Sequence, residues 1–254
     1  MKLQKDLYGL PQASYQFNKF MDGRLRLMGF KQLPGDPCAY TRWVGVNRVN
    51  ICLHADDLLV CGHAEAGQRF IGQLKKIEKF EFTTQEGDKL SYIGMTIQKM
   101  RGPDGYLVSQ EGCRQELMSR FAYDIEKFDG HGNIPAGDSL FAQPTEDDVP
   151  VDKVHYQGMV MSVMYLARLT RVDVLFATTY LASKSQAPRT RDYRCLCQVL
   201  KYLKTNPDYG LFFKKDAGFE ATIYTDSSHG LHEDGKGHIG IIATLGSGAY
   251  RPSH

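Results

Sequence analysis

Two adjacent carboxylates, Asp56 and Asp57, lie between two apolar runs, at Val49–Leu53 and Leu58–Val60. Short apolar runs that flank a turn-favouring aspartate pair predict two strands of a buried hairpin with the acids at its tip. Neighbouring anions held there repel each other, and a hard divalent cation such as Mg²⁺ or Mn²⁺ would relieve that repulsion. Because such a pair is also ordinary turn composition, this stretch alone favours a solvated polar turn over a metal site.

The second half of the chain holds further candidate groups. Asp226 ends a predicted strand, and an acidic run, Glu146-Asp147-Asp148, lies in a stretch without any apolar strand to present it. Such a run is typical of a solvated loop. A hydrophilic loop after Asp226 contains His229, His232, Glu233, Asp234 and His238. Their spacing fits no familiar zinc pattern, so we interpret this loop as polar surface.

A basic stretch near residues 184–204 could contact phosphates. Its candidate nucleic-acid-binding residues are Arg189, Arg194, Lys201 and Lys204, with Tyr193 and Tyr202 among them. A basic helix with interleaved aromatic side chains could follow a phosphate backbone. A solvated helix face has the same composition, so both interpretations stay open.

The composition is that of an ordinary globular protein. The 254 residues are 42% hydrophobic and 24% charged, and 31 basic against 29 acidic residues leave a net charge of only +2, which indicates no polyanion partner by itself. The six cysteines form no Cys-x-x-Cys pair, and three lie in apolar runs where buried reduced thiols are expected. No apolar run has transmembrane length and the N-terminus is polar. We therefore expect a soluble intracellular protein, cytoplasmic or nuclear, with no membrane partner.

Hydrophobic spacing predicts the elements that position these groups in the first half. We expect helices at residues 15–28 and 65–80, and strands around residues 39–43, on both sides of Asp56-Asp57, and at 92–97 and 105–109. Gly29 should end the first helix, and Ser109 should cap a helix that carries Cys113, Leu117 and Phe121.

The second half reads as a loop followed by helices and two strands. Residues 124–152 are rich in Gly, Pro and Asp and predict a linker or extended loop. Three helices should follow near residues 156–166, 172–184 and 195–203, and two strands at residues 221–226 and 238–245.

Six short blocks occur in order along the chain: Leu7-Tyr8-Gly9-Leu10-Pro11-Gln12-Ala13-Ser14, His54-Ala55-Asp56-Asp57, Leu90–Ile97, Met164–Asp173, Val199–Thr205 and Tyr224-Thr225-Asp226. Together they resemble the reverse transcriptase and ribonuclease H region of copia-type LTR retrotransposon polyproteins. The first two match that family's "LYGLKQAP" and "YVDD" motifs, although His54 replaces the usual tyrosine. An ordered set of blocks is far more specific than any one of them.

The resemblance implies an α+β fold with a partial polymerase palm sheet, a helical thumb and connection, and the first strands of a ribonuclease H-like fold. It implies a palm and thumb start at residues 1–123, a linker loop at 124–152, a helical connection at 153–215 and a truncated ribonuclease H start at 216–254. The implied partners are an RNA or DNA template–primer, deoxynucleoside triphosphates and other parts of the polyprotein.

The resemblance also implies residue roles. Asp56 and Asp57 would hold two Mg²⁺ (or Mn²⁺) ions that activate the primer 3′-hydroxyl and stabilise the leaving pyrophosphate. The template and nucleotide side would include Gly9, Pro11 and Gln12, and Asp226 would be one acid of the nuclease site. His54, in place of tyrosine, could titrate near neutrality beside the metals.

Partners of these acids are missing from the sequence. The family's first palm carboxylate precedes the "LYGL" block, where Asp6 is the only acid, and the partners of Asp226 belong after His254. We therefore expect a fragment of an RNA-directed DNA polymerase that is inactive by itself. The alternative is a non-catalytic, domesticated or degenerate remnant that only binds nucleic acid, and a free-standing nuclease is the least favoured interpretation.

Overall fold

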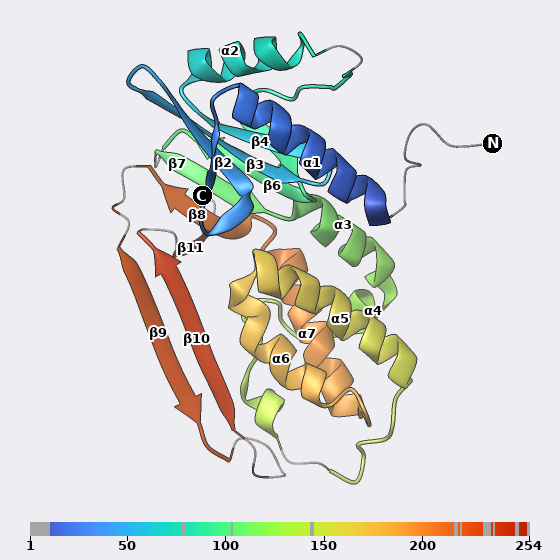
Figure 1. Cartoon of the computed structure of the whole chain (residues 1–254). Coiled ribbons are helices and arrows are strands. Elements are labelled where there is room, and N and C mark those ends of the chain that lie inside the picture. Colours follow the sequence, from blue (N-terminus) through green and yellow to red (C-terminus); the bar gives the residue numbers. More distant parts are fainter. Residues whose placement is uncertain are drawn as a thin grey trace, which may run out of the picture. The chain divides into compact units, whose positions relative to one another are not determined.

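The computed structural model describes residues 11–77, 80–102, 104–142, 145–215, 218, 220–230, 235, 237–246 and 249–252, without the side chains of 11, 12 and 249–252 (Figure 1). The chain divides into two compact units, Met1–Gln85 and Glu86–His254, which we call the first and second unit. Each unit has its own hydrophobic core. The fold is α+β, as the sequence predicts. None of the helices described is both long and apolar enough to span a membrane.

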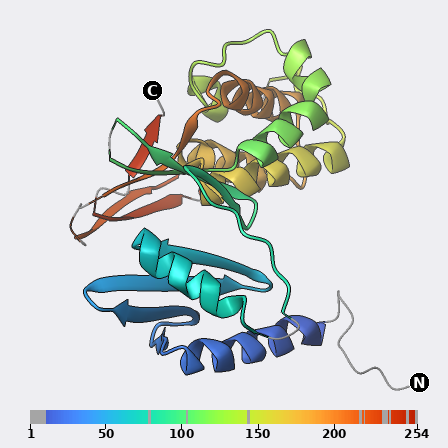
Figure 2. The same cartoon turned by 90° about the horizontal axis from the view of Figure 1, so that it is seen from above.

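The first unit is a four-stranded antiparallel sheet with two helices on one face (Figure 2). Its elements are α1 (Pro11–Leu27), β1 (Lys31–Leu33), β2 (Asp36–Val44), β3 (Asn47–His54), β4 (Asp57–Gly62) and α2 (Ala64–Leu74). The strands pair in chain order, β1-β2-β3-β4. Buried side chains of α1 and α2 meet Tyr40, Ile51 and Leu53 in one core, so both helices cover the same face of the sheet.

The end of α1 is confirmed at Gly29, which has a φ of 83°. The backbone N–H of Gly29 donates to the carbonyl of Arg26 at 2.9 Å, and that of Phe30 donates to the carbonyl of Leu25 at 3.0 Å. These two bonds close a Schellman cap, whose left-handed position favours glycine.

The second helix is shorter than predicted, because α2 ends at Leu74 and not at residue 80. Ile77 and Phe80 still pack against the core of the first unit, and the Phe80 ring lies 6.3 Å from the Phe17 ring of α1. The apolar spacing that predicts a longer helix therefore includes Ile77 and Phe80, which reach the same core from positions beyond the end of α2.

The second unit contains a helical bundle, a five-stranded sheet and a separate two-stranded ribbon. Its elements are β5 (Lys89–Tyr92), β6 (Met95–Met100), β7 (Gly105–Ser109), α3 (Glu111–Arg120), α4 (Ala122–Lys127), η1 (Asp138–Phe141), α5 (Lys153–Leu169), η2 (Val172–Val174), α6 (Leu175–Ser183), α7 (Thr190–Thr205), β8 (Tyr209–Lys214), β9 (Ala221–Ser228), β10 (His238–Leu245) and β11 (Ala249–Pro252). The sheet order is β11-β8-β7-β6-β5, and β9 pairs with β10. The predicted domain boundaries stay a prediction.

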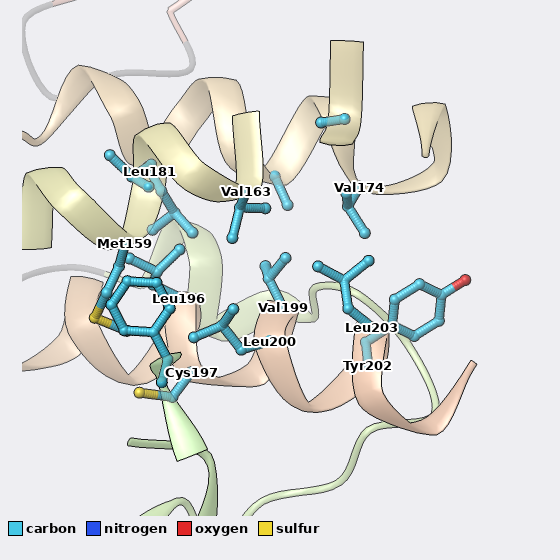
Figure 3. Close-up of a cluster of buried hydrophobic side chains, with 14 of the residues drawn as sticks. Met159, Val163, Val174, Leu181, Leu196, Cys197, Val199, Leu200, Tyr202 and Leu203 are labelled. Atoms are coloured by element: carbon cyan, nitrogen blue, oxygen red, sulfur yellow. The ribbon is translucent and has the colours of Figure 1, made fainter. Parts of the chain in front are cut away.

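The three predicted helices between the linker and the last strands are confirmed as α5, α6 and α7. Figure 3 shows their buried side chains meeting in the core of the second unit. Met159 of α5, Leu181 of α6 and Leu200 of α7 are almost completely buried there. Apolar residues at helical spacing on each helix produce this core.

Two predictions for residues 92–109 are wrong. The strand expected at residues 92–97 is broken by a turn in which Ile93 and Gly94 have φ values of 51° and 70°, and Tyr92 pairs with Met95 across it. Two central residues with positive φ are typical of a tight hairpin turn, but a β-branched residue disfavours that conformation. The N-cap of α3 is Gln110 instead of Ser109.

The predicted linker at residues 124–152 is largely irregular but docks on α7. Asp148 is only 8% exposed, so the prediction of a solvated acidic run is wrong for this residue. Its carboxylate accepts from the backbone N–H of Thr145 at 3.2 Å and of Arg191 at 3.1 Å. Glu146 and Asp147 are exposed, as predicted.

Candidate functional site

The predicted hairpin is confirmed, with both acids at its tip. His54 pairs with Asp57 across the β3–β4 ladder, so Ala55 and Asp56 form a two-residue turn. Ala55 has a φ of 48°, and a positive φ at this position suits the twist of a two-residue hairpin. The side chains of His54, Asp56 and Asp57 are exposed. The turn therefore presents two neighbouring carboxylates to solvent on a short, geometrically fixed connection.

The two faces of this hairpin differ. Residues paired across a ladder share a face, and the pairs Ile51–Val60 and Leu53–Leu58 pack toward α1 and α2. The opposite face, which we call the open face, carries Thr41, Trp43, Arg48, Asn50, Cys52, His54, Asp57, Leu59 and Cys61.

The prediction that thiols within apolar runs are buried is wrong in part. All six cysteines lie in the described chain, outside any disulfide. Cys197 is buried, but Cys52 and Cys61 are exposed. The apolar runs of the hairpin bury only one face, which is why thiols within those runs reach solvent.

The open face also carries groups that suit a planar ligand. Trp43 is 65% exposed, and the Arg48 guanidinium lies 5.9 Å from its ring centroid. Arg48 Nε donates to Thr41 Oγ1 at 2.9 Å, which holds the guanidinium beside the ring. Exposed aromatic rings and arginine planes are the groups on which nucleobases stack.

The hairpin tip fits part of a magnesium site. Carboxylate oxygens are the ligands that Mg²⁺ and Mn²⁺ prefer, and Asp56 and Asp57 supply them from one turn. Among the residues with described positions, no group of three or more His, Cys, Asp or Glu could hold a metal ion. A metal at the tip would therefore need ligands beyond these two side chains.

The other predicted site residues are distributed over both units. Gly9 lies outside the described residues, and α1 begins at Pro11 with the side chains of Pro11 and Gln12 outside the description. In the second unit, Asp226 lies on β9 opposite Gly240 and is exposed. Its Oδ1 accepts from the backbone N–H of Ser227 at 2.9 Å.

Only part of the histidine-rich loop lies within the described residues. His232, Glu233 and Asp234 lie outside the described residues, and His229 is exposed. The His238 ring lies 5.7 Å from the Phe176 ring and 6.0 Å from the Tyr180 ring, so it packs against α6.

The basic residues of α7 are partly engaged within the chain. Arg189 donates to the carbonyl oxygen of Asp148 at 2.6 Å, and Arg194 donates to Asp129 Oδ1 at 2.9 Å. Lys201 is half-buried and Lys204 is exposed. The two lysines therefore remain the better candidates for phosphate contact.

Two polar clusters escape the sequence analysis. Thr170 Oγ1 donates to Gln110 Oε1 at 2.9 Å, and both residues are buried. Beside them Arg171, only 2% exposed, forms a forked pair with Asp173 at 3.1 and 2.9 Å. In the sequence, only the family-like block Met164–Asp173 pointed to this region. Gln110 lies 60 residues before Thr170, and no residue pattern near Gln110 indicates that the two would bond.

The second cluster joins the start of the linker to α5 and α7. Asp124 Oδ1 lies 2.8 Å from His155 Nε2 and accepts from Tyr193 Oη at 2.6 Å. Burial, followed by the hydrogen bond to Asp124, raises the pKa of Tyr193. These contacts hold α4 against the helical bundle.

Comparisons with known proteins show which proteins the chain is similar to. The profile of a family described as reverse transcriptase (RNA-dependent DNA polymerase) matches residues 1–124. The chain is 26% identical, over 96% of its length, to the retrovirus-related Pol polyprotein from transposon RE1 of Arabidopsis thaliana. It is also 26% identical, over 98% of its length, to the retrovirus-related Pol polyprotein from transposon TNT 1-94 of Nicotiana tabacum.

The chain is much shorter than these plant relatives and spans 16% and 19% of their lengths. A Saccharomyces cerevisiae protein ascribed to transposon Ty5-1 is 24% identical over 98% of this chain and 79% of its own length. No solved structure matches the chain significantly. Residues 1–124 therefore match the profile of the reverse transcriptase (RNA-dependent DNA polymerase) family, and the chain is similar over nearly its whole length to retrovirus-related Pol polyproteins of copia-type transposons.

Proposed function

We propose that this chain is a segment of a retrotransposon reverse transcriptase and that its β3–β4 hairpin carries the metal-binding acids of nucleotidyl transfer. The observation that supports this best is the exposed pair Asp56-Asp57 on a two-residue turn, inside the segment that matches the family. In this proposal residues 1–123 form part of the palm and the thumb start, and 153–215 form the connection. Residues 216–254, with Asp226, would begin a ribonuclease H-like fold.

The chemistry follows from the tip geometry. Asp56 and Asp57 would hold Mg²⁺ or Mn²⁺ here, and the metal would supply Lewis acidity for the reaction of a primer 3′-hydroxyl. Asp56 and Asp57 would bind and orient the metal from a fixed turn, and Trp43 and Arg48 would contact nucleic acid on the open face. Two carboxylates are too few for a complete two-metal centre, so we propose that these 254 residues do not polymerise by themselves.

Primer extension and metal binding test this proposal separately. The purified 254-residue protein should not extend oligo(dT) on poly(rA) above background with either metal, because incomplete ligation of a two-metal site costs orders of magnitude in rate. Mn²⁺ should nevertheless broaden the amide NMR signals around Ala55, and the double variant Asp56→Asn/Asp57→Asn should abolish that broadening. Asp36→Asn, at an exposed acid of β2, is the matched control.

The absence of primer extension and the Mn²⁺ broadening can each be contradicted by experiment. Primer extension that disappears in the double variant would show a complete catalyst and contradict the proposed inactivity. Mn²⁺ broadening that is absent at the tip, or unchanged in the double variant, would contradict the metal-binding role of the hairpin.

The alternative, a remnant that only binds nucleic acid, makes its own prediction on α7. Because Arg189 and Arg194 already bond within the chain, Lys201 and Lys204 should contribute most of the phosphate contact from this helix. We expect Lys201→Gln/Lys204→Gln to reduce the slope of log K against log salt for an RNA–DNA hybrid by about 2, roughly one unit for each phosphate contact. Fluorescence anisotropy measures this slope, with Lys75→Gln/Lys76→Gln on exposed lysines as the control. An unchanged slope would leave α7 as ordinary surface.

A further inference from the structure

We propose that a small cavity beside the N-terminus of α3 is a binding site for a phosphate group, with the Gln110 amide and the Arg114 guanidinium as donors. The cavity lies entirely in the second unit, and its lining includes Gln110, Arg114, Leu166, Thr170 and Arg171. This inference does not depend on the polymerase proposal, because it rests on residues far along the chain from the acidic hairpin.

Two of the side chains that line the cavity carry buried hydrogen-bond donors that lack acceptors among the residues described. Gln110 is only 3% exposed, and its Oε1 accepts from Thr170 Oγ1. Its Nε2 is buried and finds no hydrogen-bond partner among the residues described. The same holds for Nε of Arg114. Buried donors are nearly always paired with protein, water or an ion, so two of them on one cavity indicate a missing acceptor.

The charges around the cavity favour an anion as that acceptor. The first turn of α3 presents backbone N–H groups and the positive end of a ten-residue helix, and the Gln110 side chain makes no capping bond to them. Burial lowers the pKa of Arg114, and Arg171 lowers it further. An anion would stabilise this desolvated guanidinium.

Acids near the cavity pair with other residues and leave the Nε donor of Arg114 without an acceptor among the described residues. Glu111 pairs with Lys89 at 2.9 Å, and Asp173 pairs with Arg171 at 2.9 Å. Glu111 and Asp208 also attract Arg114 through space. No bond from either acid to Nε of Arg114 is present in the described chain, so that donor remains available.

The size of the cavity limits the ligand. The space open to a water-sized sphere is about 10 Å³, which admits one oxygen atom. In the proposed complex, a phosphate group would place one oxygen in this space, where Gln110 and Arg114 would donate to it, while the remainder stays at the partly open mouth. The phosphate could be free in solution or part of a nucleic-acid backbone, because both present the same non-bridging oxygens.

NMR observes both donors directly. Titration of the full chain with inorganic phosphate should shift the Gln110 side-chain amide and Arg114 Nε–H signals in a saturable way. Gln110→Glu replaces a donor with a carboxylate, and Arg114→Lys removes the Nε donor; each should weaken phosphate binding about tenfold or more, since each loses a charge-assisted bond. Gln98→Glu and Arg120→Lys are matched controls at exposed positions of the same unit and should bind as the unmodified protein does.

A second arm identifies the source of the phosphate. An RNA–DNA hybrid in low-phosphate buffer should shift the same two signals if backbone phosphate is the ligand. Shifts with inorganic phosphate alone support the site with free phosphate as its ligand. Magnetisation transfer from water to both donors, with no shift on adding either phosphate source, would show a bound water and overturn the proposal. Equal shifts in the variants and the controls would overturn it as well.

Discussion

Replacing Arg171 by methionine should lower the free energy of unfolding of the second unit by about 3–5 kcal/mol, the usual cost of removing one partner from a buried ion pair. The Arg171 side chain is 3% exposed and that of Asp173 is 9% exposed. Arg171 donates twice to Asp173 and once, through Nη1, to the carbonyl oxygen of Asn206 at 2.9 Å. Methionine fills much of the same volume but leaves the buried Asp173 carboxylate without the two hydrogen bonds from Arg171.

The variant Arg171→Lys separates charge from geometry. Lysine keeps the positive charge but cannot make the planar double contact with Asp173, so it should recover only part of the loss. Arg168→Met is the matched control, because Arg168 is an exposed arginine three residues earlier, near the end of α5. It should change stability by less than about 0.5 kcal/mol, as exposed substitutions generally do.

Urea denaturation followed by far-UV circular dichroism measures these changes, since most of the helix lies in the second unit. A loss below about 1 kcal/mol for Arg171→Met would contradict a buried ion pair and match an exposed one. The result matters for function, because Arg171 lines the cavity with Gln110 and Arg114. A variant that loses stability here should also lose the shape of that cavity.

Local signals in the sequence account for the parts of the fold that were predicted. The hairpin follows from two apolar runs around Asp56-Asp57, and the end of α1 follows from Gly29, whose left-handed φ favours glycine. Each of these features depends on residues within a few positions of one another. The same holds for the apolar stripes of α5, α6 and α7.

Features that depend on distant residues were missed. Asp148 is buried because it meets the start of α7, and Gln110 bonds to Thr170. Neither contact leaves a pattern in the neighbouring sequence. The turn at Ile93 was missed because the local sequence is misleading there. A β-branched isoleucine favours an extended strand, whereas the β5–β6 pairing places Ile93 in a turn with a positive φ.

The candidate site likewise has one part that could be predicted from local sequence and one part that could not. The tip acids could be located from the sequence, but the open face could not, because alternation along β2 and β3 does not tell which face the helices cover. The packing of the first unit determines which face is covered: Tyr40 and Ile51 are buried in its core, and Trp43 and Cys52 are exposed to solvent.

That core also supports the second large prediction. Phe70→Ala should lower the free energy of unfolding of the first unit by about 3–5 kcal/mol, because it removes a fully buried aromatic ring and leaves a cavity. Phe70 is 0% exposed, and its ring lies 5.2 Å from the Phe30 ring. It attaches α2 to the face of the sheet that carries Ile51 and Leu53, directly beneath the hairpin.

The single tryptophan makes this change measurable by itself. Trp43 lies on β2 of the first unit, so its fluorescence follows the unfolding of that unit in urea. Tyr15→Ala, which truncates an aromatic side chain that is 67% exposed on α1, should leave the transition almost unchanged. Hydrogen exchange at the amides of β3 and β4 should accelerate in Phe70→Ala, because the hairpin loses the packing beneath it. If exchange there stays at the rate of the unmodified protein, the tip acids are held by the strand ladder alone, and the core of the first unit does not position them.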